Sequence, residues 1–145
     1  MYTILALCTG NAVRSIMAEA LLAERGGARV RALSAGSNPR GVVPEAVTAT
    51  LVRAGIGAGG LRSKGWAEVA GPGAPPLDMV LTLCAGTARE AAPVWPGRPV
   101  TVFWNIADPS ARSAAETDHA LRACLADLDA RMRAMLALPL ERRTP

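Results

Sequence analysis

Short apolar runs alternate with segments of helical periodicity along this chain, and that alternation limits its fold more than any other feature. The apolar runs that we interpret as strands lie at residues 4–8, 30–33, 78–83 and 99–103. The segments that we interpret as helices lie at residues 16–25, 44–52 and 114–138. Residues 34–39 and 57–76 are expected to be loops, with at most a short helix at 65–69. Strands that alternate with helices predict an α/β fold whose parallel sheet is covered on both faces.

The 145 residues match the size of one compact domain, which we expect to span residues 1–140, with a flexible tail at 141–145. Half of the residues are apolar and 19% are charged, which excludes a disordered composition. No apolar stretch reaches the ~18–20 residues that cross a bilayer, and no secretion signal is visible, so we expect no membrane partner. Three cysteines, an odd number, indicate free thiols in a reducing compartment, and we expect a cytoplasmic protein.

The chain carries 16 basic and 12 acidic residues, and Lys64 is its only lysine. Arginine offers a planar fork of donors that suits oxyanions. No run of basic residues exists and aromatics make up 3% of the chain, which argues against a nucleic-acid partner. His119, the only histidine, is expected at the surface near the start of the last helix. No group of histidines, cysteines and carboxylates has the spacing of metal ligands, so we expect no metal site.

The segment Cys8-Thr9-Gly10-Asn11-Ala12-Val13-Arg14-Ser15 joins the first predicted strand to the first predicted helix. Ligand sites of α/β sheets lie at this carboxyl end of the strands. Such a loop can turn its backbone N–H groups toward an anion at a helix N-terminus, and Gly10 and Asn11 tolerate the backbone angles that this requires. Arg14 can grip two oxygens of a tetrahedral oxyanion, while the positive field and the Ser15 hydroxyl favour a Cys8 thiolate. We therefore expect residues 9–14 to bind an oxyanion that Cys8 attacks.

Three further residues bear on this chemistry. Asp108 follows the last predicted strand and should face the same edge of the sheet as Cys8, where a carboxylic acid can protonate a leaving oxygen. The pair Asp108-Pro109 is also a common way to open a turn. Cys84 ends the third predicted strand and should reach the same edge. Cys124 lies among the leucines of the last predicted helix, which favours a role in core packing.

Residues 8–15, followed by Ile16-Met17-Ala18-Glu19-Ala20, resemble the nucleophile loop of the low-molecular-weight protein tyrosine phosphatase superfamily, and the similarity covers nearly the whole chain. The other segments that carry it are Ser34-Ala35-Gly36, Ser63-Lys64-Gly65-Trp66, Pro93-Val94-Trp95-Pro96-Gly97 and Trp104 ahead of Asp108-Pro109. Within the superfamily the chain is most similar to arsenate reductases. The resemblance implies a three-layer sandwich with a four-stranded parallel sheet, a general acid at Asp108, no bound cofactor, and reduction of arsenate to arsenite in arsenical resistance.

The resemblance also implies a second thiol, because reduction of arsenic(V) to arsenic(III) takes two electrons. Cys84 aligns with the first of two redox cysteines in the thioredoxin-coupled members, whereas Ala92 stands where the second is expected, and Val13 where a further cysteine is often found. Two routes stay open. Cys84 resolves the adduct on Cys8, or glutathione or another small thiol does so, and glutaredoxin or a thioredoxin-like protein recycles Cys8. Because a third redox thiol is missing, we favour the external thiol.

A second function uses the same loop, namely hydrolysis of phosphoesters through a phospho-cysteine intermediate. A phosphotyrosine phosphatase needs aromatic side chains at the entrance of its site to hold the substrate ring. Here Ser110-Ala111-Arg112 follow the Asp-Pro pair, and Tyr2 and Phe103 are the only tyrosine and phenylalanine. The sequence therefore favours arsenate over phosphotyrosine as the oxyanion substrate.

Overall fold

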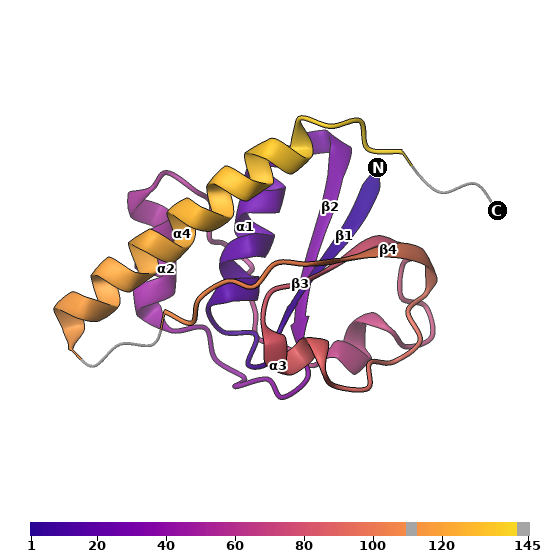
Figure 1. Ribbon diagram of the computed structural model, residues 1–145, viewed down its shortest axis with the longest axis horizontal. Helices are drawn as coiled ribbons and strands as arrows, with labels where there is room; N and C mark the ends of the chain where they lie inside the picture. Colours follow the sequence, from indigo (N-terminus) through magenta and orange to yellow (C-terminus); the bar gives the residue numbers. More distant parts are fainter. Residues whose placement is uncertain (110–112, 142–145) are drawn as a thin grey trace.

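Four parallel strands form the sheet in the described part of the chain, residues 1–109 and 113–141 of a computed structural model (Figure 1). The strands are β1 (Tyr2–Cys8), β2 (Val30–Gly36), β3 (Leu77–Thr82) and β4 (Gly97–Phe103), in the spatial order β2-β1-β3-β4. The helices are α1 (Arg14–Gly26), α2 (Glu45–Arg53), α3 (Ala85–Ala88) and α4 (Ala114–Leu136), with 3-10 turns at Gly27–Arg29 and Trp66–Val69. Because β1 and β3 are central neighbours, their carboxyl ends meet at the middle of one sheet edge.

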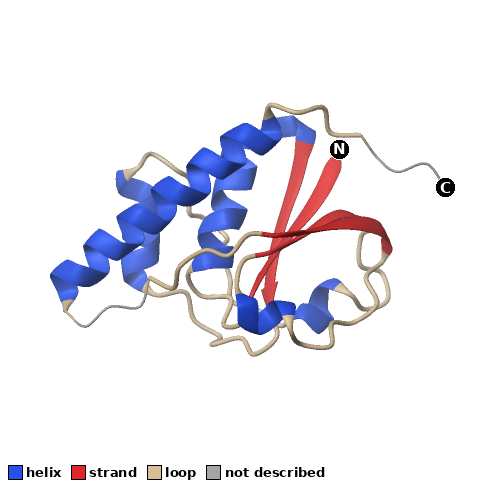
Figure 2. Ribbon diagram, viewed as in Figure 1, coloured by secondary structure: helices blue, strands red, loops and turns tan. Residues whose placement is uncertain are grey.

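The two faces of the sheet are covered unequally (Figure 2). Along β1, Ile4 and Ala6 belong to the large core with α1, α2 and α4, whereas Leu5 and Leu7 belong to a smaller core on the opposite face. That second face is covered by the 3-10 turn Trp66–Val69, by the short α3 and by loops, and Trp66 and Trp95 meet edge to face there. The predicted α/β sandwich with a four-stranded parallel sheet is confirmed, with one thin outer layer.

Several predicted boundaries are wrong in detail. The segment expected to be a loop from residue 34 is the last part of β2, because Ser34, Ala35 and Gly36 continue the register opposite Ala6, Leu7 and Cys8. Pairing with β1 extends β2 to residue 36, and the sequence of this segment by itself does not indicate that extension. The fourth strand begins at residue 97, α4 ends at residue 136, and α3 was not predicted at all. The extension of β2 matters for the site, since it brings residues 34–36 beside the loop after β1.

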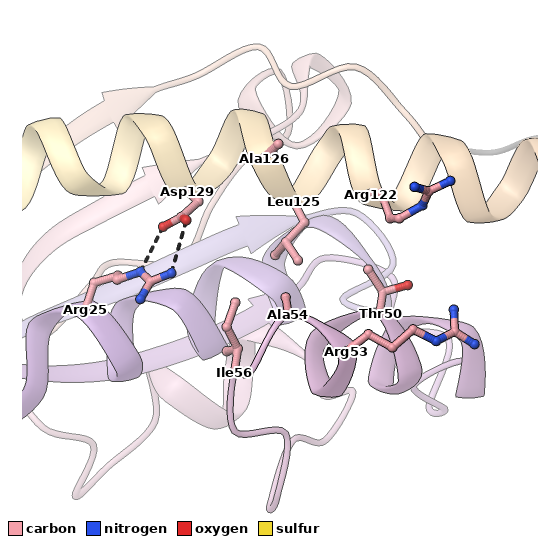
Figure 3. Close-up of a pocket in the computed structure, with 9 residues that line it drawn as sticks. All are labelled: Arg25, Thr50, Arg53, Ala54, Ile56, Arg122, Leu125, Ala126 and Asp129. Atoms are coloured by element: carbon pink, nitrogen blue, oxygen red, sulfur yellow. Dashed lines mark hydrogen bonds and ion pairs between the residues drawn. The ribbon is translucent and has the colours of Figure 1, made fainter.

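A bidentate ion pair between Arg25 and Asp129 links α1 to α4 (Figure 3). Arg25 Nε lies 2.9 Å from Asp129 Oδ1, and Arg25 Nη2 lies 3.1 Å from Asp129 Oδ2. The pair borders a pocket between α2 and α4 whose apolar lining includes Ile56 and Leu125. Among the described helices, none combines the length and the apolar character needed to cross a bilayer.

Candidate functional site

The turn between β1 and α1 is a tight loop of residues 9–13. Asn11 has a φ of 43°, in the left-handed region that few side chains tolerate. Gly36, at the end of β2, presses against the loop: a Cβ atom there would lie 2.5 Å from the Thr9 carbonyl oxygen and 2.9 Å from the Asn11 nitrogen. A side chain at position 36 would therefore push the loop out of shape, so the glycine is required by close approach of the two backbones.

The backbone carbonyls and N–H groups of this loop have different partners. The Thr9 and Gly10 carbonyls accept hydrogen bonds of 2.9 Å from the N–H groups of Asn38 and Arg40, in the segment after β2. The N–H groups of residues 10–13 donate no hydrogen bond to another group in the part of the chain that the structure describes. A run of such donors just ahead of a helix N-terminus is the arrangement that binds anions.

Cys8 ends β1 directly before this loop and is buried. Its Sγ lies 2.9 Å from Ser15 Oγ, which is itself buried in the first turn of α1. Asn11 Nδ2 donates to the same Ser15 oxygen at 2.7 Å. Because Ser15 accepts from Asn11, its hydroxyl hydrogen is available for the sulfur, and a thiolate is the better acceptor for it.

Arg14 joins the loop to the segment that carries Asp108. Its Nη1 donates to the carbonyl oxygen of Ile106 at 3.1 Å, two residues before Asp108 in the loop after β4. Asp108 is exposed, whereas Pro109 is buried. The guanidinium that we expect to grip an oxyanion thus already contacts the loop of the expected general acid.

Cys84 was expected to end the third strand, but β3 ends at Thr82, and Cys84 lies two residues further on, at the N-cap of α3, beside Thr9 of the nucleophile loop. Its Sγ lies 3.4 Å from Thr9 Oγ1 and 3.1 Å from Thr87 Oγ1, and the two hydroxyl oxygens are 3.0 Å apart. Burial by itself would raise the pKa of the Cys84 thiol, but hydrogen bonds with Thr87 and Thr9 outweigh burial and lower that pKa from its ordinary value. A second thiol with enhanced thiolate character therefore adjoins the residue that follows Cys8.

The sequence analysis also singled out Cys124, His119 and Ala92, and the structure places each of them outside the nucleophile loop. Cys124 is buried in the large core, as predicted, and burial raises the pKa of its thiol to about 11. His119 is exposed on α4, and Ala92 is exposed in the loop between α3 and β4. Residues 110–112 and 142–145 lie outside the described residues. Within the described ranges, no group of three or more His, Cys, Asp or Glu residues gathers closely enough to hold a metal ion.

The sequence analysis assigned no role to four residues that the structure places around the loop, namely Glu19, Ser34, Lys64 and Thr87, although the first three lie in segments that carry the resemblance. Ser34 Oγ accepts from Asn11 Nδ2 at 3.0 Å and donates to Glu19 Oε1 at 2.6 Å. The backbone N–H of Lys64 donates to Asn11 Oδ1 at 2.8 Å. Hydroxyls and carboxylates carry no spacing signal for such contacts, so the resemblance marked these segments without showing which side chains meet.

Comparison with known proteins gives consistent results. The family model described as low molecular weight phosphotyrosine protein phosphatase matches residues 3–143. An arsenate reductase of Bacillus licheniformis is 33% identical over 117 residues, which cover 80% of each chain.

Solved structures agree with this likeness. The crystal structure of an arsenate reductase from Archaeoglobus fulgidus superposes with a TM-score of 0.69 at 25% identity, over 93% of this chain and 99% of that one. An arsenate reductase in a phosphate-binding state superposes with a TM-score of 0.77 at 22% identity, over 94% of this chain and 98% of that one, which supports the fold.

Proposed function

This chain belongs to the low molecular weight phosphotyrosine protein phosphatase family, and within that family we propose that it is an arsenate reductase. One observation carries the proposal: two thiols, Cys8 and Cys84, adjoin the same loop, with Thr9 following the first and contacting the second. Phosphoester hydrolysis needs one nucleophilic thiol, whereas reduction by thiols needs two sulfur atoms. The similarity to the arsenate reductase of Bacillus licheniformis supports the same choice.

The proposed binding step uses the loop as an oxyanion cradle. Arsenate accepts hydrogen bonds from the backbone N–H groups of residues 10–13, and Arg14 turns from Ile106 to two of its oxygens. Thr9 and Ser15 frame the bottom of the cradle through their contacts with Cys84 and Cys8. In this proposed pose the arsenic atom faces the Cys8 sulfur, because Cys8 directly precedes the loop that holds the anion.

The proposed chemical step begins with attack of the Cys8 thiolate on arsenic. A sulfur–arsenic(V) bond forms, and one arsenic–oxygen bond breaks as Asp108 protonates the departing oxygen, which leaves as water. A second thiolate then attacks the Cys8 sulfur. The sulfur–arsenic bond breaks, its electron pair stays on arsenic, and arsenite leaves while a disulfide forms at Cys8.

The second thiol has two candidates. An external thiol such as glutathione would leave a mixed disulfide on Cys8, which glutaredoxin or a thioredoxin-like protein reduces. Cys84 would instead leave a Cys8–Cys84 disulfide. Its lowered pKa and its contact with Thr9 favour Cys84, whereas the alanine at position 92 favours the external thiol, since no further cysteine can carry the disulfide outward.

The activity is tested by supplying the purified protein with arsenate and glutathione plus glutaredoxin, or with arsenate and thioredoxin plus its reductase, and separately with an aryl phosphate. We expect arsenite from at least one reductant, slow release of phosphate, and loss of both activities in Cys8→Ser. Rapid hydrolysis of the aryl phosphate without arsenite would assign the protein as a phosphatase. Turnover that persists in Cys8→Ser would remove Cys8 as nucleophile.

The route is tested with Cys84→Ser and by mass spectrometry of the protein quenched with acid during turnover. An external thiol predicts a Cys8–glutathione adduct and retained activity in Cys84→Ser. An internal route predicts a Cys8–Cys84 bridge and no activity in that variant.

A further inference from the structure

Arg40 lies against the nucleophile loop, in the segment that follows β2. Its backbone N–H donates to the Gly10 carbonyl oxygen at 2.9 Å. Its side chain covers the same glycine, since a Cβ atom built on Gly10 would lie 3.2 Å from Arg40 Nε, 3.4 Å from its Cγ and 3.6 Å from its Cδ. The side chain of Arg40 thus runs past a residue whose own N–H group belongs to the proposed oxyanion site.

Arg40 brings a positive charge that no ion pair compensates. The residue is exposed, and its guanidinium forms no ion pair with an acidic side chain in the part of the chain that the structure describes. Lys64, whose backbone N–H contacts the loop at Asn11, is different, because its side chain pairs with Glu19 at 3.6 Å. Arg40 therefore adds net positive charge beside the loop, whereas the lysine does not.

Two acidic side chains border the same edge of the sheet, and each repels an anion when it is ionised. Glu90 accepts a hydrogen bond of 2.8 Å from Ser37, in the same segment as Arg40. Asp108 is exposed in the loop that Arg14 contacts. A site concentrates anions only where positive potential prevails, and Arg40 supplies a second positive charge against these two carboxylates.

We propose that Arg40 is a specificity-determining residue of the oxyanion site: its positive charge beside Gly10 attracts anions to the nucleophile loop and so favours anionic over neutral reactants at Cys8. The charge acts through space, so contact between Arg40 and the anion is not required. The inference rests on the proposed function in taking residues 9–14 as an oxyanion site and Cys8 as the nucleophile. It does not involve the chemistry of arsenic, so it can be tested without arsenate.

The test compares alkylation of Cys8 by iodoacetate and by iodoacetamide, with peptide mapping to separate Cys8 from the other cysteines. Both reagents lose iodide to the same thiolate, but only iodoacetate carries a negative charge. The ratio of the two rates therefore cancels a change in the thiolate itself and reports the attraction of anions. In Arg40→Met we expect this ratio to fall about threefold at low salt, as loss of one exposed charge within a Debye length implies.

Salt separates an electrostatic effect of Arg40 from a steric one. Between about 0.01 M and about 1 M salt the Debye length falls from about 30 Å to about 3 Å. The difference in ratio between the unchanged protein and Arg40→Met should therefore disappear at the higher concentration. A difference that persists there would assign the effect to the shape of the side chain and overturn the proposal.

Binding of inorganic phosphate gives a second readout. Phosphate that occupies the loop should protect Cys8 from iodoacetamide, and the phosphate concentration that gives half protection measures its affinity. At constant low ionic strength we expect Arg40→Met to need about threefold more phosphate than the unchanged protein.

Two further variants are the controls. Arg40→Lys keeps the charge and should keep the ratio of the unchanged protein. Arg31 is exposed opposite Thr3, near the amino end of β2 and far from the loop, so Arg31→Met removes the same charge without an effect on the ratio. Methionine at position 40 keeps the unbranched stem over Gly10 and the backbone hydrogen bond, and thermal unfolding verifies that each variant is folded.

An unchanged ratio or an unchanged phosphate requirement in folded Arg40→Met would overturn the proposal. An equal fall of the ratio in Arg31→Met or in Arg40→Lys would overturn it as well, because net charge or side-chain shape would then be the cause. The outcomes stay separate from those of the proposed function. The expected ratios in a protein that produces no arsenite refute the reductase and keep the role of Arg40, whereas arsenite production with an unchanged ratio refutes only that role.

Discussion

At the scale of single residues, the three cysteines differ in electrostatic surroundings more than in burial. Cys84 and Cys124 are 5% and 7% exposed, so access alone does not distinguish them. Cys84 lies between two threonine hydroxyls that stabilise its thiolate, whereas Cys124 lies among apolar side chains of α4. Burial without hydrogen bonds is what raises the pKa of Cys124 to about 11.

This contrast predicts the order of alkylation. At pH 8 only about one Cys124 side chain in 10³ would be a thiolate, whereas the lowered pKa of Cys84 gives it a far larger thiolate fraction. We expect iodoacetamide to modify Cys84 at least about 100-fold faster than Cys124 in the folded protein. Peptide mapping by mass spectrometry measures both rates. Equal rates in the folded protein would contradict the assigned surroundings, and equal rates in denaturant are the control.

Asp108 is the second residue whose role can be isolated. As the expected general acid it acts on the departing oxygen, so Asp108→Asn should lower kcat by about 10²-fold or more and leave KM nearly unchanged. Steady-state kinetics of arsenite release measure both constants. Asp118→Asn, in the first turns of α4 where Asp118 pairs with Arg53 and Arg122, is the comparison variant and should leave both constants within twofold. A rise in KM without loss of kcat would make Asp108 a binding residue instead.

At the scale of elements, the nucleophile loop takes its shape from β2 as well as from its own sequence. Gly36 sits against the loop backbone, and the segment that follows β2 holds the Thr9 and Gly10 carbonyls. These contacts turn the two carbonyls away, and the N–H groups of residues 10–13, which donate to no other described group, are the donors of the proposed oxyanion site. The extension of β2 beyond residue 33 is therefore part of the site.

Gly36→Ala tests this dependence. Its methyl group would lie 2.5 Å from the Thr9 carbonyl oxygen, and only movement of the backbone can relieve that overlap. We expect the free energy of unfolding to fall by about 1–3 kcal/mol, as overpacking does elsewhere, and the affinity for arsenate to fall with it. Urea unfolding and titration with arsenate measure the two effects. Gly57→Ala has open space around the added methyl group and should change stability by less than about 0.5 kcal/mol.

At the scale of the whole molecule, α1, α2 and α4 form one layer on the same face of the sheet, and their packing fixes the position of α1, which begins at the nucleophile loop. Helix α1 begins at Arg14 of the nucleophile loop and ends near Arg25, which binds Asp129 on α4. Hydrogen bonds from Arg25, and a weaker one from Arg133, outweigh burial and lower the pKa of the Asp129 carboxyl from its ordinary value. The ion pair thus connects the far end of α1 to the longest helix.

The sign of this pKa shift predicts a dependence of stability on pH. A carboxyl whose pKa is lower in the folded state stabilises the fold above its unfolded pKa of about 3.9, and that contribution is lost as the pH falls through the folded value. We expect Asp129→Asn to be less stable than the unchanged protein by about 1 kcal/mol at pH 7, a value discounted for partial exposure, and the difference to shrink as the pH falls below the unfolded pKa. Urea unfolding across pH measures it. Asp127→Asn, which loses only the exposed pair with Arg131, should show a smaller difference.

The sequence by itself determined the alternation of strands and helices, the loop from Cys8 to Ser15, and the placement of Cys84 and Asp108 at the same edge. These features depend on local periodicity and on the rule that parallel strands end at one edge, so no knowledge of packing was needed. The tertiary structure alone decided the length of β2, the crowding of three helices on one face, and the hydrogen bonds that link Glu19 through Ser34, Asn11 and Ser15 to Cys8. Each of these depends on contacts between groups that are distant in the sequence, such as Ser34 and Glu19, 15 residues apart, and packing decides which of these groups meet.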